Sequence, residues 1–187
     1  MKKKNMEELR RLSVEEFKAS EKTPLVVVLD NVRSQNNVGS VFRTADAFRV
    51  EKICLCGITA HPPHRDIHKT ALGAEDAVDW QYYAETAECV KELKGQGYEV
   101  YAVEQVDDSA MLHGWQPKGQ GRGVALVFGN EIEGVQQELI PLCDGSIEIP
   151  QFGTKHSLNI SCAAAIVMWE AFKRLRCDAG LEKQHGG

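Results

Sequence analysis

From Pro24 onward, short apolar runs rich in valine and isoleucine alternate with segments of helical periodicity. The apolar runs predict strands at residues 25–29, 52–56, 99–103, 124–128 and 146–149. The helical segments cover residues 38–48, 85–94, 136–142 and 159–176. Because continuously apolar strands are buried on both faces, the pattern predicts an α/β fold, a parallel sheet with helices on both faces. In that architecture, ligands bind at the carboxyl ends of the strands.

The segments outside this pattern indicate the domain organisation. Residues 6–18 carry apolar side chains at near-helical spacing, so residues 1–23 are predicted to form an N-terminal helical extension. The main domain then spans residues 24–176, and residues 177–187 form a flexible tail. Residues 59–80 and 107–123 lack a regular pattern, and loops of that length in a compact domain are usually functional or mobile.

The composition argues against several classes of protein. The six cysteines form no CxxC pair and the charged N-terminus lacks the apolar core of a signal peptide, so a cytoplasmic location is expected. No run approaches the roughly 18 apolar residues of a membrane helix, and no membrane partner is expected. A net charge of -5 argues mildly against a nucleic-acid partner. Five basic residues nevertheless lie in or near predicted loops: Arg33, Arg43, Arg65, Lys69 and Lys155.

The first strand is followed by NNVGSVFRTADA, residues 36–47. Asn37 is placed at the helix start, where its side chain can cap free backbone N–H groups, and Gly39 permits close approach of a neighbour. Arg43 lies inside an otherwise small and apolar helix face. The alternative is a surface arginine paired with Asp46, and the segment taken alone favours that alternative.

Two further strand ends carry polar clusters. The segment FGNEIEG, residues 128–134, has glycines on both sides of Glu131, which predicts either a tight turn whose backbone contacts a ligand or a plain glycine-rich turn. The segment at residues 149–161 brings a polar cluster to the start of an apolar helix. Helix capping accounts for one of its polar residues but not for all of them: Thr154, Lys155, His156, Ser157, Asn159 and Ser161.

Several common sites are disfavoured. The chain has no GxxxxGKS/T and no GxGxxG after its first strand, which argues against a P-loop nucleotidase and a dinucleotide-dependent oxidoreductase. His61, His64 and His68 have an HxxH spacing, but Pro62 and Pro63 fix an extended loop and no cysteine is near. No metal site is therefore expected.

Taken together, the three segments resemble the SpoU, or TrmH-like, family of ribose 2'-O-methyltransferases in the SPOUT superfamily. The motifs that carry the resemblance are NNVGSVFRTADA, FGNEIEG and IPQFGTKHSLNISCAAAI, and the similarity extends over residues 24–176. The resemblance implies a C-terminal deep trefoil knot that binds S-adenosylmethionine. Such a knot is an exception to the rule that chains do not thread loops.

The resemblance also implies roles for individual residues. The cofactor-binding set is Val103, Gly129, Ile149, Ser157 and Leu158, and the catalytic set is Arg43, Asn37, Glu131, Ser157 and Asn159. Because a guanidinium stays protonated, Arg43 is expected to hold an RNA phosphate and to stabilise charge on the 2'-oxygen rather than to act as a base. Most family members have methionine where Gln151 stands, so the resemblance implies backbone contacts to the cofactor at this position and no side-chain contact.

The resemblance further implies RNA as the partner and a homodimer that builds its RNA site across two subunits. tRNA is favoured over rRNA, because many rRNA-modifying relatives carry an additional RNA-binding domain, and a D-loop guanosine is a first target to consider. The 59–80 loop, with Arg65 and Lys69, is expected to face this RNA. The alternatives are an rRNA 2'-O-methyltransferase and a catalytically silent RNA-binding module of the same fold.

Overall fold

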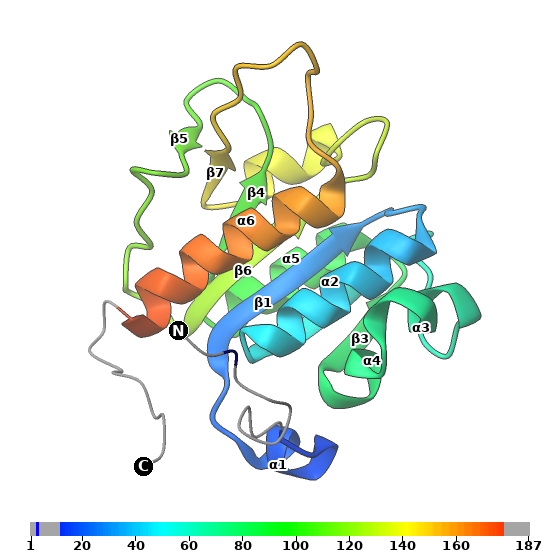
Figure 1. Cartoon of the computed structure of the whole chain (residues 1–187). Helices are drawn as coiled ribbons and strands as arrows, with labels where there is room; N and C mark the ends of the chain where they lie inside the picture. Colours follow the sequence, from blue (N-terminus) through cyan, green and yellow to red (C-terminus); the bar gives the residue numbers. More distant parts are fainter. Residues whose placement is uncertain (1–2, 4–11, 178–187) are drawn as a thin grey trace.

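The computed structural model describes residue 3 and residues 12–177, and its centre is a seven-stranded, wholly parallel sheet (Figure 1). This confirms the predicted fold class. From one edge to the other the strands are β3 (Asp79–Tyr83), β2 (Val50–Cys56), β1 (Thr23–Asp30), β6 (Gly123–Phe128), β4 (Tyr98–Val103), β7 (Gly145–Glu148) and β5 (Ala110–Met111).

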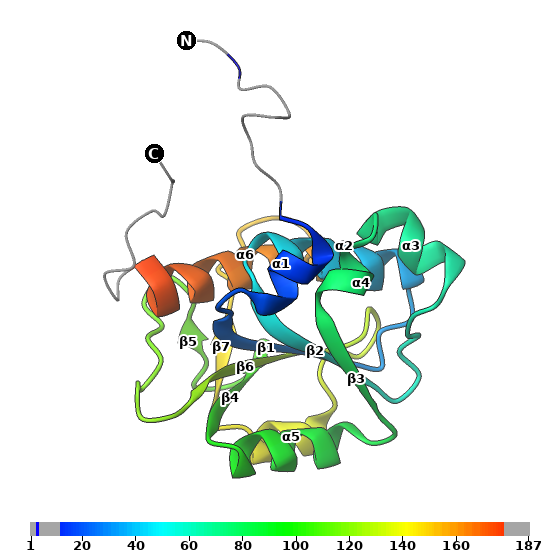
Figure 2. The same ribbon diagram turned by 90° about the horizontal axis from the view of Figure 1, so that it is seen from below.

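Helices cover both faces of the sheet, as the apolar strands require (Figure 2). One face carries α1 (Val14–Ala19), α2 (Gln35–Ala47), α3 (Arg65–Ala71), α4 (Ala74–Ala77) and α6 (Ile160–Phe172). The other face carries α5 (Thr86–Gly95) and the 3-10 helix η1 (Gln137–Leu142). In β1, Leu25, Val27 and Leu29 pack toward the first group of helices, whereas Val26 and Val28 pack toward α5 and η1.

The prediction of a long loop at residues 59–80 is wrong. This segment forms α3 and α4 and leads into the edge strand β3. Of the five residues in β3 only Tyr83 is buried, so the strand lacks the apolar run by which the central strands were found. The predicted loop at residues 107–123 contains only the two-residue strand β5 before β6 begins.

The start of α2 also differs from the prediction. The helix begins at Gln35 instead of Val38, and its N-cap is Ser34, whose Oγ accepts a hydrogen bond from the Asn37 backbone N–H at 3.3 Å. Asn37 therefore lies in the first turn and is not the cap. Its side chain is left available for contacts outside the helix.

The two ends of the chain are described in part. Of the helix predicted at residues 6–18, residues 6–11 lie outside the described residues, and α1 begins at Val14 behind a capping box formed by Ser13 and Glu16. Phe17 of α1 is buried in the same core as α2 and α6, so this part of the extension packs onto the main domain. After α6, the chain continues through the π-helical turn η2 (Lys173–Cys177), and the rest of the predicted tail, residues 178–187, lies outside the described residues.

Candidate functional site

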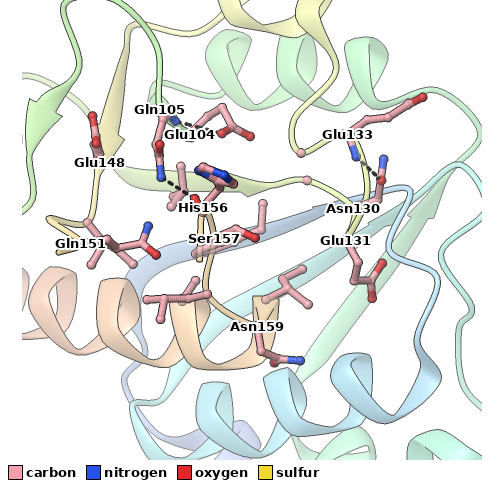
Figure 3. A pocket seen from close by; sticks show the side chains of 18 of the residues that line it. Glu104, Gln105, Asn130, Glu131, Glu133, Glu148, Gln151, His156, Ser157 and Asn159 are labelled. Atoms are coloured by element: carbon pink, nitrogen blue, oxygen red, sulfur yellow. Dashed lines mark hydrogen bonds between the residues drawn. The ribbon is translucent and has the colours of Figure 1, made fainter. Parts of the chain in front are cut away.

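A cavity of about 480 Å³ opens at the carboxyl edge of the sheet, where β4, β6 and β7 end and α6 begins (Figure 3). All five residues predicted to bind the cofactor line it: Val103, Gly129, Ile149, Ser157 and Leu158. Of the predicted catalytic residues, Glu131, Ser157 and Asn159 also line it. Segments that are far apart in the sequence thus converge on one hollow.

The lining combines apolar side chains with acidic ones. Val103, Phe128, Ile147, Ile149 and Leu158 supply an apolar surface. Among the described residues that line the cavity, four are glutamates and none is a lysine or an arginine: Glu104, Glu131, Glu133 and Glu148. Such a hollow suits a ligand that has a flat apolar part and a positive charge.

The loop after β6 is held in a tight turn by hydrogen bonds within the loop. Asn130 Oδ1 accepts hydrogen bonds from the N–H groups of Ile132 and Glu133, both at 2.9 Å, and Asn130 pairs with Gly134 through two backbone hydrogen bonds of 3.1 Å. A Cβ atom at Gly129 would overlap the backbone of Gly134 and Val135. Glycine at position 129 is therefore what lets the two ends of the turn meet at the cavity wall.

Two side chains that follow β4 hold the loop after β6 and the segment before α6 in place. The Glu104 carboxylate accepts a hydrogen bond from the Val135 N–H at 3.0 Å, next to Gly134. The Gln105 Nε2 group donates to the His156 carbonyl at 3.0 Å and thereby fixes the polar segment before α6 (Figure 3). Glu104 and Gln105 lie outside the three sequence motifs and were not predicted as site residues, although their position at a strand end is a usable signal.

A chain of hydrogen bonds joins three of the predicted catalytic residues across these loops. Glu131 Oε1 accepts from Asn37 Nδ2 at 3.0 Å, and Asn37 Oδ1 accepts from Asn159 Nδ2 at 3.3 Å. Glu131 and Asn159 both extend toward α2, the pale blue helix in Figure 3. Asn37 does not line the cavity itself but connects the two residues that do.

The Glu131 carboxylate also anchors the chain ahead of α2. It accepts hydrogen bonds from the backbone N–H groups of Arg33 and Ser34, both at 3.2 Å. Burial raises the pKa of this carboxyl, but hydrogen bonds from its own backbone, Asn37, Arg33 and Ser34 outweigh that effect, and the pKa is lowered overall. Glu131 is thus held as an anion beside the start of the helix.

The lowered pKa of Glu131 predicts a pH-dependent contribution to stability. A carboxyl whose pKa falls on folding stabilises the protein above its unfolded pKa, about 4.3, and this contribution is lost as the pH drops through the folded value. Glu131→Gln is expected to lower the free energy of unfolding at pH 7 by less than about 1 kcal/mol, because the group is largely solvated. Urea unfolding at pH 7 and at pH 3.5 measures the difference in the free energy of unfolding between the wild type and Glu131→Gln. A difference that is as large at pH 3.5 as at pH 7 contradicts the lowered pKa of Glu131.

Asn159 has a second function as the N-cap of α6. Its Oδ1 accepts hydrogen bonds from the Ser161 N–H at 2.9 Å and from the Ser161 hydroxyl at 2.6 Å, while its Nδ2 donates to Asn37. Asn159→Ala is expected to cost about 0.5–2 kcal/mol of stability and to disturb the alignment of a ligand in the cavity. Asn159→Ser keeps a cap but cannot reach Asn37, so it should regain stability without restoring that alignment. A kinetic defect in Asn159→Ala with unchanged melting would argue against the dual role.

Arg43 is placed apart from the cavity. It is exposed on α2, on the same side as Asn36 and Ala47, and it is not among the described residues that line the hollow. Within the described part of the chain, its side chain makes none of the hydrogen bonds that join the cavity loops to α2. The structure brings together Asn37, Glu131, Ser157 and Asn159 but leaves Arg43 on the surface.

The histidine-rich loop gives no metal centre in the described residues. His61 stacks on Trp80, His64 Nδ1 accepts from the Asp66 N–H, and His68 pairs with Glu75. Over residue 3 and residues 12–177, no group of three or more histidine, cysteine or acidic residues is arranged to hold a metal ion. Over the same residues, no helix is both long and apolar enough to cross a membrane.

The similarity to known proteins agrees with this geometry. A family model described as the SpoU rRNA Methylase family matches residues 24–169, which include all three loops of the cavity. This chain belongs to the SpoU rRNA methylase family. The resemblance drawn from the three sequence motifs is therefore confirmed.

Individual SpoU family members are similar over most of the chain. The tRNA (guanosine(18)-2'-O)-methyltransferase of Thermus thermophilus is 33% identical over 174 residues, which are 93% of this chain and 87% of that protein. The TrmH/SpoU tRNA modifying enzyme of A. aeolicus has a TM-score of 0.78 at 25% identity and matches 90% of this chain and 83% of its own. The AdoMet-bound rRNA methyltransferase from Sinorhizobium meliloti has a TM-score of 0.75 at 30% identity, covering 83% of this chain and 58% of its own.

Proposed function

We propose that this SpoU family protein transfers a methyl group from S-adenosylmethionine to a ribose 2'-hydroxyl of RNA. The observation that carries the proposal is the cavity in which the loops after β4, β6 and β7 meet the start of α6. The similar structure from Sinorhizobium meliloti is described as an AdoMet-bound rRNA methyltransferase, which supports the same cofactor here. No metal takes part in the proposal.

The residues of the cavity fit this cofactor chemically. Bound S-adenosylmethionine supplies an electrophilic methyl group on a positively charged sulfur. Val103, Ile149 and Leu158 offer an apolar slot for a flat ring, and the exposed backbone groups around Gly129 and Ser157 can satisfy its polar edges. The four glutamates in the lining favour a cationic ligand over an anionic one.

The remaining predicted residues act on the RNA side of the reaction. Ser157 and Asn159 lie where the cavity meets α6 and are proposed to orient the ribose, with Asn37 and Glu131 holding Asn159 in position. Orienting two reactants lowers the barrier by several kcal/mol, so positioning is the larger contribution. Arg43 is proposed to hold an RNA phosphate bidentately and to stabilise the 2'-oxygen as its proton leaves to phosphate or water.

Exposed apolar side chains on α6 support the proposal of a homodimer. Cys162, Ile166 and Trp169 lie on one side of α6 and are exposed, Ile166 to 42% and Trp169 to 49%. Trp169 contacts Phe48 at the end of α2, with ring centroids 5.8 Å apart, so the patch continues toward the helix that bears Arg43. A two-fold interface on this face would bring Arg43 of one subunit near the cavity of the other.

The path of the chain is compatible with the trefoil knot that the family resemblance implies. After η1, the chain forms β7 beside β4, passes the cavity, and returns as α6 to pack against α2 and β1. We include the knot, and a cytoplasmic location, in the proposal.

tRNA is the proposed substrate, with a D-loop guanosine as the target. The support is the similarity to a tRNA (guanosine(18)-2'-O)-methyltransferase over 93% of the chain. rRNA is the second candidate, because the Sinorhizobium meliloti relative is described as an rRNA methyltransferase. A silent RNA-binding module is the third.

Methyl transfer in vitro separates these candidates. The purified protein is incubated with labelled S-adenosylmethionine and either a tRNA transcript, a 23S rRNA transcript, or the same tRNA with 2'-deoxyguanosine at the D-loop position. The proposal predicts label in the tRNA, and none when the 2'-hydroxyl is absent. Label in rRNA alone would select the second candidate. RNA binding without any label would select the silent module.

A further inference from the structure

A second hollow, of about 670 Å³, lies around α3 at the β3 edge of the sheet. Its lining shares no residue with the first cavity. It consists of the following residues: Pro62, Pro63, His64, Arg65, His68, Lys69, Glu75, Asp76 and Trp80. None of these residues belongs to the predicted catalytic or cofactor-binding sets, although Arg65 and Lys69 are expected from the sequence to face the RNA.

Trp80, which lines this hollow, stands together with two further aromatic rings, those of His61 and Tyr82. The His61 ring stacks on Trp80, with centroids 5.6 Å apart and planes inclined by 18°, and lies 5.5 Å from Tyr82. Trp80 and Tyr82 alternate along β3 and so face the same side of the sheet, where they are 36% and 45% exposed. The Tyr82 hydroxyl donates to the Gly57 carbonyl at 3.0 Å, which fixes the group in place.

Arg65 lines the same hollow as Trp80 and is the cation that remains available there. Lys69 pairs with Asp66 at 2.7 Å, and Glu75 is occupied by His68 and by the Gly73 N–H. Asp76 lines the hollow as well and is exposed. Within the described residues, Arg65 is exposed and has no ion pair.

The helix α3, which carries Arg65, is held against the start of α2 next to Asn37. The Thr70 hydroxyl of α3 donates to the Asn36 carbonyl at 2.9 Å, one residue before Asn37. Gly39 of α2 allows this contact, because a Cβ atom there would overlap the Ile67 carbonyl and the Thr70 hydroxyl. Figure 1 shows α3 beside the amino-terminal half of α2, and the loop after β2 leaves the same carboxyl edge of the sheet as the cavity loops.

We infer that His61, Trp80, Tyr82 and Arg65 form a second RNA-docking surface, which holds an unpaired nucleotide of the substrate outside the methyl-transfer cavity. The base stacks on the aromatic rings and its phosphate pairs with Arg65. Stacking on aromatic rings tolerates any base, whereas the arginine supplies the salt-dependent contact to the backbone. The inference depends on the proposed function, since it assumes an RNA substrate.

Substitutions at Trp80 and Arg65 test this surface. Trp80→Ala is expected to raise the KM and the Kd for a tRNA transcript about tenfold, because one stacked base is lost. Trp80→Phe should retain most of the affinity. Arg65→Ala should weaken binding and reduce the slope of log K against log salt by about one. In all three variants, kcat at saturating tRNA and the Kd for S-adenosylmethionine should equal those of the wild type.

Two controls make the outcome decisive. Lys91→Ala removes an exposed cation from α5, on the opposite face of the sheet, and should bind tRNA as the wild type does. Thermal melting checks that Trp80→Ala folds, and Arg65, being exposed, tests the surface without disturbing the core. If the wild type methylates tRNA while Trp80→Ala and Arg65→Ala show an unchanged KM and Kd for tRNA, the docking surface is overturned and the proposed function stands. If the wild type methylates no RNA, the proposed function fails.

Discussion

Replacing Arg43 with alanine is expected to reduce methyl transfer by about 10²–10³-fold, the usual effect of removing one group that stabilises developing charge. Its guanidinium is exposed on α2 and is not among the described residues that line the cavity. The substitution should therefore leave the melting temperature and the Kd for S-adenosylmethionine unchanged. Single-turnover methylation of tRNA measures the loss.

Arg43→Lys is the matched control for this substitution. Lysine keeps the positive charge but lacks the planar pair of donors that fits a phosphate. We expect Arg43→Lys to bind tRNA nearly as well as the wild type and to remain strongly impaired in transfer. Near-normal turnover in Arg43→Ala would remove Arg43 from the catalytic set.

Mixed dimers test whether Arg43 acts on the cavity of the other subunit. The Arg43→Ala protein is mixed with a second protein that carries Ser157→Phe. The phenylalanine fills the cavity of that protein and leaves its Arg43 intact. If each site takes its arginine from one subunit and its cavity from the other, an equal mixture should regain about a quarter of the wild-type activity, because half of the dimers have one complete site. If the mixture remains inactive after subunit exchange, each cavity takes its arginine from its own subunit.

Gly129→Ala is expected to have the largest effect on the cavity itself. A Cβ atom at this position would overlap backbone atoms of Gly134 and Val135, which no side-chain rotation can relieve. The turn that forms the cavity wall must then open, at a cost of about 1–3 kcal/mol in stability. Because Gly129 lines the cavity, we also expect cofactor binding to be lost.

Thermal denaturation with and without S-adenosylmethionine measures both effects. At 100 times its Kd the cofactor should stabilise the wild type by about 2.7 kcal/mol, and it should not stabilise Gly129→Ala. Gly95→Ala is the matched control, because a Cβ atom at the end of α5 meets nothing within 4 Å. Full cofactor stabilisation of Gly129→Ala would show that the loop after β6 is not part of the cofactor site.

Burial explains which elements could be predicted from the sequence. The strand β1 is apolar almost throughout and was found within two residues of its ends. β3 was missed because four of its five residues are exposed at the sheet edge. α3 was missed because only Ile67 and Ala71 are buried, too few to produce a helical period.

The candidate site was predictable only where local sequence carries the signal. Glycines and polar residues at strand ends located Glu131, Ser157 and Asn159, and family resemblance added the apolar lining. The hydrogen bonds that Asn37 donates to Glu131 and that Asn159 donates to Asn37 join residues 94 and 122 positions apart, which no spacing rule connects. The same holds for Glu104 and Gln105, whose importance comes from the distant loops that they hold.

Nucleotide-resolution mapping of 2'-O-methyl groups tests the central claim most directly. Total RNA from cells with the protein, without it, and with only Arg43→Ala is compared across tRNA and rRNA. The proposed function predicts a 2'-O-methylguanosine in the D-loop of tRNA that is present in the first sample and absent from the other two. Identical 2'-O-methyl maps in all three samples would contradict it.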